Sequence, residues 1–319
     1  MTQETRTHTY LVTGGAGFIG SHMVDALLKQ GHTVRVVDNF STGHRANLAH
    51  NADQIDLHEI SITDKDALAK AMQGVDYVFH LAALASVPRS VEDPLSNNEH
   101  NVTGTLNVLL TARDAGVKRV VYAGSSSAYG NIDSEFKSED MTPQPLSPYA
   151  VAKLAAEQYC QVFTEVYGLE TVTVRYFNVF GPRQDPLSAY AAVIPKFVTM
   201  MLDDSPATIE GDGLQSRDFT FIENVVHGNL LACHTAGVAG QVFNIACGDH
   251  INLLDMVEML NKLLGTHLDP VFVAPRAGDV KHSRAAIDKA RQMLGYDPVV
   301  SFEEGLARTL DWYKNAAPA

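Results

Sequence analysis

The sequence contains few cysteines and few cationic side chains for its 319 residues. The three cysteines, Cys160, Cys233 and Cys247, lie far apart, so a disulfide framework is excluded and no metal-ligand spacing is present. We expect reduced, mostly buried thiols and no metal site. The 24 Lys and Arg residues stand against 37 Asp and Glu residues, a formal net charge of −13, which disfavours binding to nucleic acid or anionic lipid.

Long apolar runs are also missing. The nearest case, residues 190–202, is interrupted by Lys196 and is shorter than the ~18 residues that span a bilayer. The stretch from Met1 to His8 is polar and has no apolar signal core. We therefore expect no membrane association and a cytoplasmic location.

Hydrophobic residues make up 45% of the chain, enough for a large core. In the first half, short β-type runs alternate with helical patterns, which predicts the doubly wound α/β fold with a parallel sheet. The expected strands are 10–13, 34–38, 55–60, 75–81, 119–123 and 171–176, and the expected helices are 18–30, 64–73, 101–115 and 149–167. Gly and Pro interrupt the second half, where we expect helices at 223–236, 253–264, 287–294 and 302–314 and strands at 241–246 and 271–273.

A glycine-rich turn joins the first strand to the first helix. Gly14, Gly17 and Gly20 permit a tight turn and let a pyrophosphate approach the free N–H groups of the helix N-terminus. Asp38 ends the second strand eighteen residues after Gly20, where a carboxylate accepts hydrogen bonds from an adenosine ribose and repels a 2′-phosphate. The pattern favours an NAD site over an NADP site; a structural turn followed by a surface Asp is the alternative.

Hydroxyl and amine side chains follow the fifth strand. Ser125, Ser126 and Ser127 stand at its carboxyl end, where open α/β sheets bind ligands. Tyr149 and Lys153 lie four residues apart on one helix face. The ammonium group, together with a cationic nicotinamide ring, is expected to lower the pKa of the phenol from ~10 toward 7 and make it a general base. Taken alone, this spacing is also typical of an ordinary helix.

Along essentially its whole length, the sequence resembles the extended short-chain dehydrogenase/reductases, and within them the nucleotide-sugar 4-epimerases. The resemblance rests on the three motifs above and on the stretches 38–43, 80–83, 101–105, 175–178, 216–219 and 276–279. Two more stretches, 86–90 and 190–196, resemble the branch that handles UDP-N-acetylhexosamines.

The resemblance implies an isomerase with tightly bound NAD and a UDP-sugar substrate. It implies an NAD-binding Rossmann domain of residues 1–177, to which 219–247 return, and a smaller mixed α/β substrate domain of residues 178–218 and 248–319. The implied NAD contacts are Gly14, Gly17, Phe18, Ile19, Gly20, Asp38, Asn39, Ser41, Thr42, Gly43, Ile62, Leu81, Ala82, Ala83, Tyr149, Lys153 and Tyr176. The implied UDP-sugar contacts are Ser86, Arg89, Ser125, Ser126, Ser127, Tyr149, Asn178, Ala192, Val193, Arg217, Arg276, Asp279 and Ser283.

One position departs from the family pattern. The family usually carries Asp-Ile after the third strand, at the adenine edge, whereas Ser61 and Ile62 align here. The strength of an adenine contact through Ser61 therefore stays open.

The resemblance also implies the chemistry. Tyr149, with Lys153 and Ser125, takes the proton of the sugar 4-hydroxyl, while hydride passes from C4 to NAD and returns to the opposite face of a 4-keto sugar. Dehydrating and decarboxylating relatives place an acid just after the catalytic Ser or Thr, but residues 126–128 are Ser-Ser-Ala, which favours simple epimerisation. His80 is more typical of a packed strand-end side chain than of an acid.

Three interpretations stay open. The favoured one is a 4-epimerase of UDP-glucose/UDP-galactose and of UDP-N-acetylglucosamine/UDP-N-acetylgalactosamine. The second is a UDP-uronate 4-epimerase or another NAD-dependent nucleotide-sugar oxidoreductase, and the third is a non-catalytic dinucleotide-binding regulator. The family further implies a homodimer, formed through the helices that carry Asn101 and Tyr149.

Ser283 bears on the size of the substrate. It stands four residues after Asp279, where epimerases restricted to plain hexoses carry a bulky Tyr. A hydroxymethyl group there leaves room for an N-acetyl group, and a Ser283 that only faces solvent is the alternative.

Overall fold

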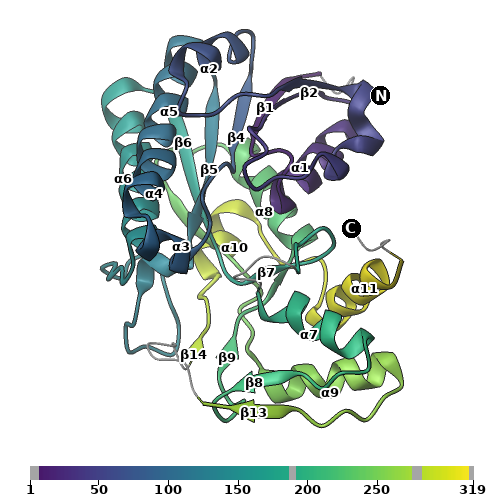
Figure 1. The fold of residues 1–319 in the computed structure, drawn as a ribbon. Helices are drawn as coiled ribbons and strands as arrows, with labels where there is room; N and C mark the ends of the chain where they lie inside the picture. The colour runs from purple at the N-terminus through teal and green to yellow at the C-terminus, as the bar shows by residue number, and fades with distance from the viewer. Residues whose placement is uncertain (1–6, 187–191, 275–281, 316–319) are drawn as a thin grey trace, which may run out of the picture.

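A seven-stranded parallel sheet forms the centre of the molecule in the computed structural model, which describes residues 7–186, 192–274 and 282–315 (Figure 1). The strand order is β11–β6–β5–β4–β1–β2–β3. The strands are β1 (Thr9–Thr13), β2 (Thr33–Val37), β3 (Ile55–His58), β4 (Tyr77–His80), β5 (Arg119–Ser125), β6 (Glu170–Tyr176) and β11 (Val242–Ile245). The predicted doubly wound sheet is confirmed, and the strand order reverses between β1 and β4, the place where such sheets bind ligands.

Helices cover both faces of this sheet because alternate strand residues point to opposite sides. Tyr10 and Val12 of β1 pack in one core with α1 (Phe18–Lys29) and α8 (Ile222–His234). Leu11 packs in a second core on the other face, which is covered by α2 (Lys65–Ala71), α5 (Gly104–Asp114) and α6 (Pro148–Tyr167). The central strands are therefore buried on both sides, as their near-continuous apolar sequence requires.

A smaller group of elements lies beside the carboxyl ends of the strands, in the lower part of Figure 1. Its helices are α7 (Val193–Leu202), α9 (Leu253–Leu264) and α11 (Phe302–Asn315), and α10 (Asp288–Leu294) packs against α8 and β11. Its short strands pair as β7 (Val179–Phe180) with β10 (Thr220–Phe221), β8 (Thr208–Glu210) with β13 (Val271–Val273), and β9 (Ser216–Arg217) with β12 (Ile251–Asn252) and β14 (His282–Ser283). The segment that forms α8 and β11 thus returns to the main sheet between two stretches of the smaller group.

The chain between β4 and α5 differs from the prediction of a single helix starting at Asn101. It forms α3 (Val87–Glu92), α4 (Pro94–Asn98) and a π-helical turn, η3 (Glu99–Thr103), before α5. Ser86 and Asp93 cap the two short helices by accepting bonds from backbone N–H groups. Pro and short polar stretches hide such one-turn helices from a search for long periodic patterns.

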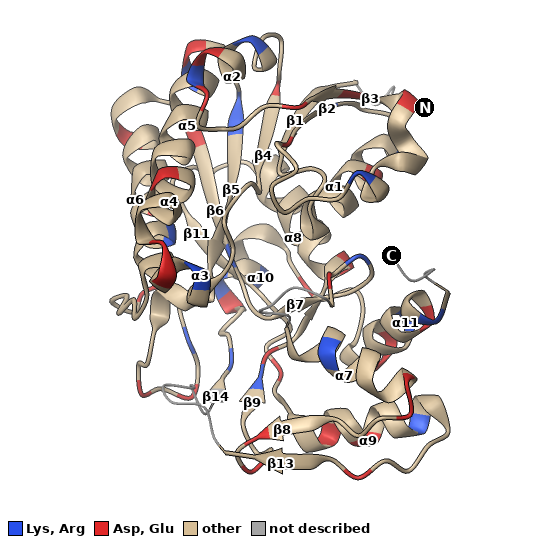
Figure 2. Cartoon of the chain, in the orientation of Figure 1, with Lys and Arg blue, Asp and Glu red and all other residues tan. Residues whose placement is uncertain are grey.

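Charged residues lie mainly on helices and loops, and most residues of the central sheet are uncharged (Figure 2). Among the described residues, no helix is long and apolar enough to cross a membrane. Over the same residues, no group of three or more His, Cys, Asp or Glu side chains is arranged to hold a metal ion.

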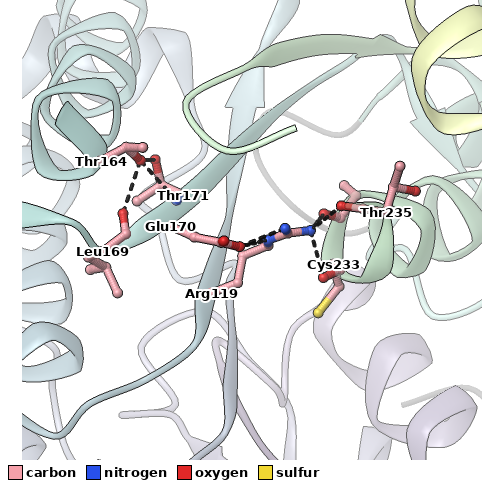
Figure 3. A network of polar contacts seen from close by, with 8 residues as sticks. Arg119, Thr164, Leu169, Glu170, Thr171, Cys233 and Thr235 are labelled. Atoms are coloured by element: carbon pink, nitrogen blue, oxygen red, sulfur yellow. Dashed lines mark hydrogen bonds and ion pairs between the residues drawn. The ribbon is translucent and has the colours of Figure 1, made fainter. Parts of the chain in front are cut away.

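One buried arginine ties together three elements at the amino ends of the strands (Figure 3). Arg119 is 5% exposed, and its Nη1 donates to the carbonyls of Ala232, Cys233 and Thr235, which end α8, at 3.0, 2.9 and 2.7 Å. Its Nη2 lies 2.6 Å from a carboxylate oxygen of Glu170 on β6. The side chain therefore satisfies the carbonyls at the end of α8 and fixes that helix against β5.

Replacing this arginine is expected to cost stability. Arg119→Ala should lower the free energy of unfolding by about 2–4 kcal/mol, because several buried carbonyls lose their donor. Urea unfolding followed by circular dichroism measures this, with Arg113→Ala, whose guanidinium pairs with the neighbouring Asp114, as the control. Equal, small losses in both variants would contradict the assignment.

Candidate functional site

A cleft opens where β1, β2 and β4 end. It is lined by Gly14, Gly17, Phe18, Ile19, Gly20, Val37, Asp38, Asn39, Ser41, Thr42, Gly43, Ile60, Ser61, Ile62, Leu81, Ala82, Ala83, Leu84, Ala85 and His100. The structure thus brings together the residues predicted to contact NAD, apart from Tyr149, Lys153 and Tyr176. The motif search missed His100, because it is a single side chain at the π-helical turn.

The glycines let three backbone segments approach closely. A Cβ at Gly14 would lie 2.8 Å from the backbone of Ala82, and one at Gly20 would lie 2.0 Å from the carbonyl oxygen of Gly14. Gly14 also has a φ of +70°, which disfavours other residues. Gly17 precedes α1 without any side-chain cap, and the first residues of the helix line the cleft, so no capping side chain competes for their N–H groups. This cradle fits the pyrophosphate of a dinucleotide.

Asp38 lies at the end of β2 and is 7% exposed. Its carboxylate accepts hydrogen bonds from the backbone N–H groups of Ala16 at 2.9 Å and Phe40 at 2.8 Å. Burial raises the pKa of Asp38, and these two hydrogen bonds act in the opposite direction. The carboxylate is held in one orientation beside Gly43, where it fits a ribose diol and opposes a 2′-phosphate.

Ser125 and Tyr149 meet beyond the end of β5. The Ser125 Oγ lies 2.8 Å from that of Ser127 and accepts a bond from the Ser127 N–H. Ser147 caps α6 and the N–H of Tyr149 donates to Ser90 Oγ at 3.1 Å, which fixes the first turn of the helix. Burial raises the pKa of Tyr149, and a hydrogen bond with the side chain of Ser125 lowers it.

Lys153 is buried, with 4% exposure, and its Nζ lies 4.5 Å above the ring of Tyr122. Burial lowers the pKa of Lys153 to about 8, while Cys160 and Glu157 oppose that shift. Burial raises the Tyr149 pKa and the Ser125 hydrogen bond lowers it, while the Lys153 ammonium lies over the Tyr122 ring. A lowering of the Tyr149 pKa by Lys153 and a bound nicotinamide stays a prediction.

Buried hydrogen bonds settle the state of His80, which is 1% exposed. The Thr105 hydroxyl donates to the Asn101 carbonyl, so it accepts from His80 Nε2 at 2.9 Å. His80 Nδ1 then accepts from the Thr13 hydroxyl at 2.7 Å. Burial lowers the pKa of His80 to about 3. The ring is a neutral packing element, as the sequence indicated.

A second cleft lies in the smaller group of elements, where β7, α7, β8 and β9 contribute to its wall. Its lining residues are Asn178, Val179, Phe180, Ala192, Val193, Ile194, Lys196, Phe197, Thr208, Glu210, Gln215, Arg217, Phe219 and Leu253. The structure therefore brings together four predicted substrate contacts, Asn178, Ala192, Val193 and Arg217. Glu210 and Gln215 were missed because a three-residue strand and the loop before β9, from which they come, carry no recognisable motif.

The remaining predicted substrate residues occupy different places. Ser283 of β14 stands opposite Arg217 of β9 in a parallel pair, which puts it at the same edge as the second cleft. Ser86 caps α3, Arg89 is exposed on the same helix, and Ser126 is half-buried in a short helical turn after β5. Arg276 and Asp279 lie outside the described residues. Tyr176, predicted to contact NAD, is buried at the end of β6 and its hydroxyl donates to Asn229.

A doubly wound sheet with a glycine cradle, a ribose-binding acid and a Ser, Tyr and Lys group defines a dinucleotide-dependent enzyme. The chain belongs to the NAD dependent epimerase/dehydratase family, whose sequence model matches residues 10–246. NAD is therefore its cofactor, in agreement with the geometry of the first cleft.

Named relatives cover almost the whole chain. The UDP-glucose 4-epimerase of Mycolicibacterium smegmatis is 38% identical over 309 residues, which are 96% of this chain and 98% of that protein. The UDP-glucuronate 4-epimerase of Thermodesulfobacterium geofontis is 36% identical over 315 residues, 96% of each chain. The solved structure of UDP-N-acetylglucosamine 4-epimerase from Methanobrevibacter ruminantium M1, in complex with UDP-N-acetylmuramic acid, superposes with a TM-score of 0.93 at 39% identity, covering 97% of this chain and 99% of that one. The resemblance to nucleotide-sugar 4-epimerases is confirmed.

Proposed function

We propose that this protein interconverts the C4 epimers of a UDP-hexose through a transient 4-keto sugar, with NAD retained between turnovers. The observation that carries the proposal is the position of Ser125. Its strand β5 pairs on one side with β4, which leads to Ala82 in the first cleft, and on the other with β6, which leads to Asn178 in the second. A sugar attached to a nucleotide in the second cleft reaches the end of β5, beside the cofactor cleft.

The roles of individual residues follow from this placement. NAD, when bound, supplies the hydride acceptor and donor for C4. Tyr149 removes the proton from the 4-hydroxyl and returns it, while Ser125 holds the reacting oxygen through its hydroxyl. Lys153 contributes a fixed positive charge within the same helix turn. No acid stands in residues 126–128 to expel a hydroxyl, which favours epimerisation over dehydration.

We also propose that the two parts of the chain bind different ligands. Residues 1–177 with 219–247 bind NAD, and residues 178–218 and 248–319 bind the UDP-sugar. Arg217 lines the second cleft, and with Arg276 it is proposed to hold the pyrophosphate, because guanidinium matches phosphate oxygens in pairs. In a chain with a net charge of −13, such local cations and backbone N–H groups have to supply the anion affinity.

For the sugar, we propose both plain and 2-acetamido hexoses. The relatives just named act on three different sugars, according to their names, so similarity alone does not choose among them. Ser283 is half-buried, and its strand pairs with the strand that carries Arg217 of the second cleft. A small side chain there leaves room for an N-acetyl group, so we favour the acetamido sugars.

A direct assay tests the function. Incubating the protein separately with UDP-glucose, UDP-N-acetylglucosamine and UDP-glucuronate, and resolving C4 epimers by NMR, is expected to show epimerisation of the first two. Epimerisation of UDP-glucuronate alone would refute the proposed substrate. A net consumption of NAD without the formation of epimers would refute the proposed reaction.

Tyr149→Phe is expected to lower kcat by at least ~100-fold with UDP-sugar affinity broadly intact, because it removes the general base and little else. Steady-state kinetics and calorimetry measure the two quantities. Tyr167→Phe, at the exposed end of the same helix, is the matched control. Near-full turnover by Tyr149→Phe would remove this residue from the mechanism.

The pKa of Lys153 predicts an alkaline limb in the activity profile. The amine carries its charge below about 8 and loses it above, so kcat is expected to fall as the pH rises beyond 8. In Lys153→Arg the guanidinium stays charged, and the fall should move to higher pH. An alkaline limb at the same pH in both proteins would assign it to another group.

Ser283→Tyr is expected to suppress kcat/KM for UDP-N-acetylglucosamine far more than for UDP-glucose, because a phenol ring occupies the space of the N-acetyl group. Ser205→Tyr, at an exposed position, is the control. Equal losses on both substrates, or no wild-type activity on the acetylated sugar, would refute the role.

We propose a homodimer through the helices that carry Asn101 and Tyr149. Val151, Val162 and Val166 of α6 are 53, 46 and 66% exposed, and Leu95 of α4 is 82% exposed. Burying them against a second copy would stabilise a dimer. Sedimentation velocity should therefore give a dimer for the wild type and a monomer for Val162→Lys, and a wild-type monomer at micromolar concentration would refute the proposal.

A further inference from the structure

Asp218 is a fully buried acid to which the reaction described above gives no role. It directly follows Arg217, the last residue of β9, and it lines neither of the two clefts. The sequence motif at 216–219 assigned a ligand contact to Arg217 and nothing to Asp218. A buried carboxyl group that does not line a ligand cleft has to be explained by the polar groups around it.

Three backbone N–H groups converge on the Asp218 carboxylate. One oxygen accepts a hydrogen bond from Cys247 at 2.9 Å, and the other accepts from Gly248 at 3.0 Å and Ala285 at 3.2 Å. Cys247 and Gly248 stand just beyond β11, the edge strand of the main sheet, whereas Ala285 stands two residues after β14. The carboxylate therefore joins the main sheet to the strand that carries Ser283.

The backbone of Asp218 contacts two more residues with proposed roles in substrate binding. Its N–H donates to the Ser283 carbonyl at 2.9 Å, and its carbonyl accepts from Asn178 Nδ2 at 3.0 Å. Asn178 stands two residues after β6 and lines the second cleft together with Arg217. Asp218 thus lies where Asn178, Arg217 and Ser283 are attached to the main sheet.

A carboxylate suits this position better than an amide. Its two oxygens accept all three N–H groups, whereas an Asn side chain has one oxygen and would turn its own N–H groups toward at least one donor. Burial raises the pKa of Asp218 to about 7, and the N–H groups of Cys247, Ala285 and Gly248 act in the opposite direction. The ionised form therefore predominates at pH 8.

Other contacts hold the same segments without this carboxylate. Strand β9 pairs with β12 and with β14, and Arg284 Nε donates to the Gly248 carbonyl at 2.8 Å. Loss of the carboxylate is therefore expected to displace β9 and β14 from the end of β11 while each strand keeps its partner.

We propose that Asp218 is a positioning residue, which fixes β9 against the main sheet so that the Arg217 guanidinium meets the pyrophosphate of the nucleotide. The inference rests on the proposed binding of a UDP-sugar in the second cleft. Ser125 and Tyr149 belong to β5 and α6, and Asp218 forms its hydrogen bonds elsewhere. Asp218 therefore serves the binding of the nucleotide and not the proton and hydride transfers.

A double-mutant cycle tests whether Asp218 acts through Arg217. Calorimetry at pH 8 measures UDP affinity for the wild type, Arg217→Ala, Asp218→Asn and the double variant. Asp218→Asn should weaken UDP binding by about 10-fold, as for the loss of one charge-assisted hydrogen bond. The double variant should bind UDP as weakly as Arg217→Ala alone, because the two changes remove the same contact.

The outcomes of the cycle separate this role from the proposed function. Losses that multiply in the double variant, or an Asp218→Asn protein with wild-type affinity, would overturn the role of Asp218 alone. Full affinity in Arg217→Ala, or a wild type that does not bind UDP, would overturn both this role and the proposed pyrophosphate contact.

Steady-state kinetics with UDP-glucose distinguish positioning from a general loss of structure. Asp218→Asn should raise KM by about 10-fold and change kcat by less than about 2-fold, since binding is lost equally in the ground and transition states. Bound NAD, measured by mass spectrometry, should stay at the wild-type level. A fall in kcat at unchanged KM, or a loss of NAD, would contradict the proposal.

Asn224→Ala is the matched control. This side chain is also fully buried, and it accepts hydrogen bonds from the N–H groups of Val299 and Val300 at 2.7 and 2.9 Å, but it does not line the second cleft. It should lower stability and leave KM unchanged, and an equal rise in KM in this variant would contradict the proposal.

Asp218→Ser goes through the same measurements. It removes the carboxylate without turning an amide N–H toward the three donors, so it guards against an Asp218→Asn protein that folds poorly. The same non-additive loss with Arg217→Ala is expected, and wild-type UDP affinity in either variant would overturn the proposal.

Discussion

A chain of buried hydrogen bonds through Thr13, His80 and Thr105 fixes the strand ends around which the rest of the site is built. It joins the end of β1 to the end of β4 and to the first turn of α5, and the Thr13 hydroxyl also accepts from the N–H groups of Leu81 and Ala82, both at 3.2 Å. The cofactor cleft lies between those strand ends. Because the imidazole is neutral and both its nitrogens form hydrogen bonds, this series of hydrogen bonds contains no charged group.

The protein handles anionic ligands with few cations. The glycine cradle presents backbone N–H groups and a helix N-terminus to a pyrophosphate, and these donors do not depend on net charge. The Lys153 ammonium lies on an aromatic ring, where burial makes its charge easier to lose. Backbone N–H groups and a helix N-terminus therefore provide the affinity for anions that the net negative charge of the chain does not.

Much of the fold was predictable from periodicity. The seven strands of the main sheet and the helices α1, α2, α6, α8 and α9 lie close to their predicted ranges, because apolar runs bounded by Gly and Pro are strong signals. The short helices α3 and α4 were missed. So was α7, whose residues were considered as a candidate membrane segment and as part of a family-like stretch, but not as a helix. One-turn helices and two-residue strands depend on packing partners that a local pattern does not contain.

The sequence by itself determined the dinucleotide cradle, the acid at the end of β2 and the Ser, Tyr and Lys group, since each stands in a short motif at the end of a strand or the start of a helix. Only the tertiary structure decided the state of His80, the orientation of Lys153 toward Tyr122, and the meeting of His100 with the loop of Ser61. These depend on contacts between segments distant in the chain. Burial and hydrogen-bond partners, which set tautomer and charge, exist only after those segments have packed.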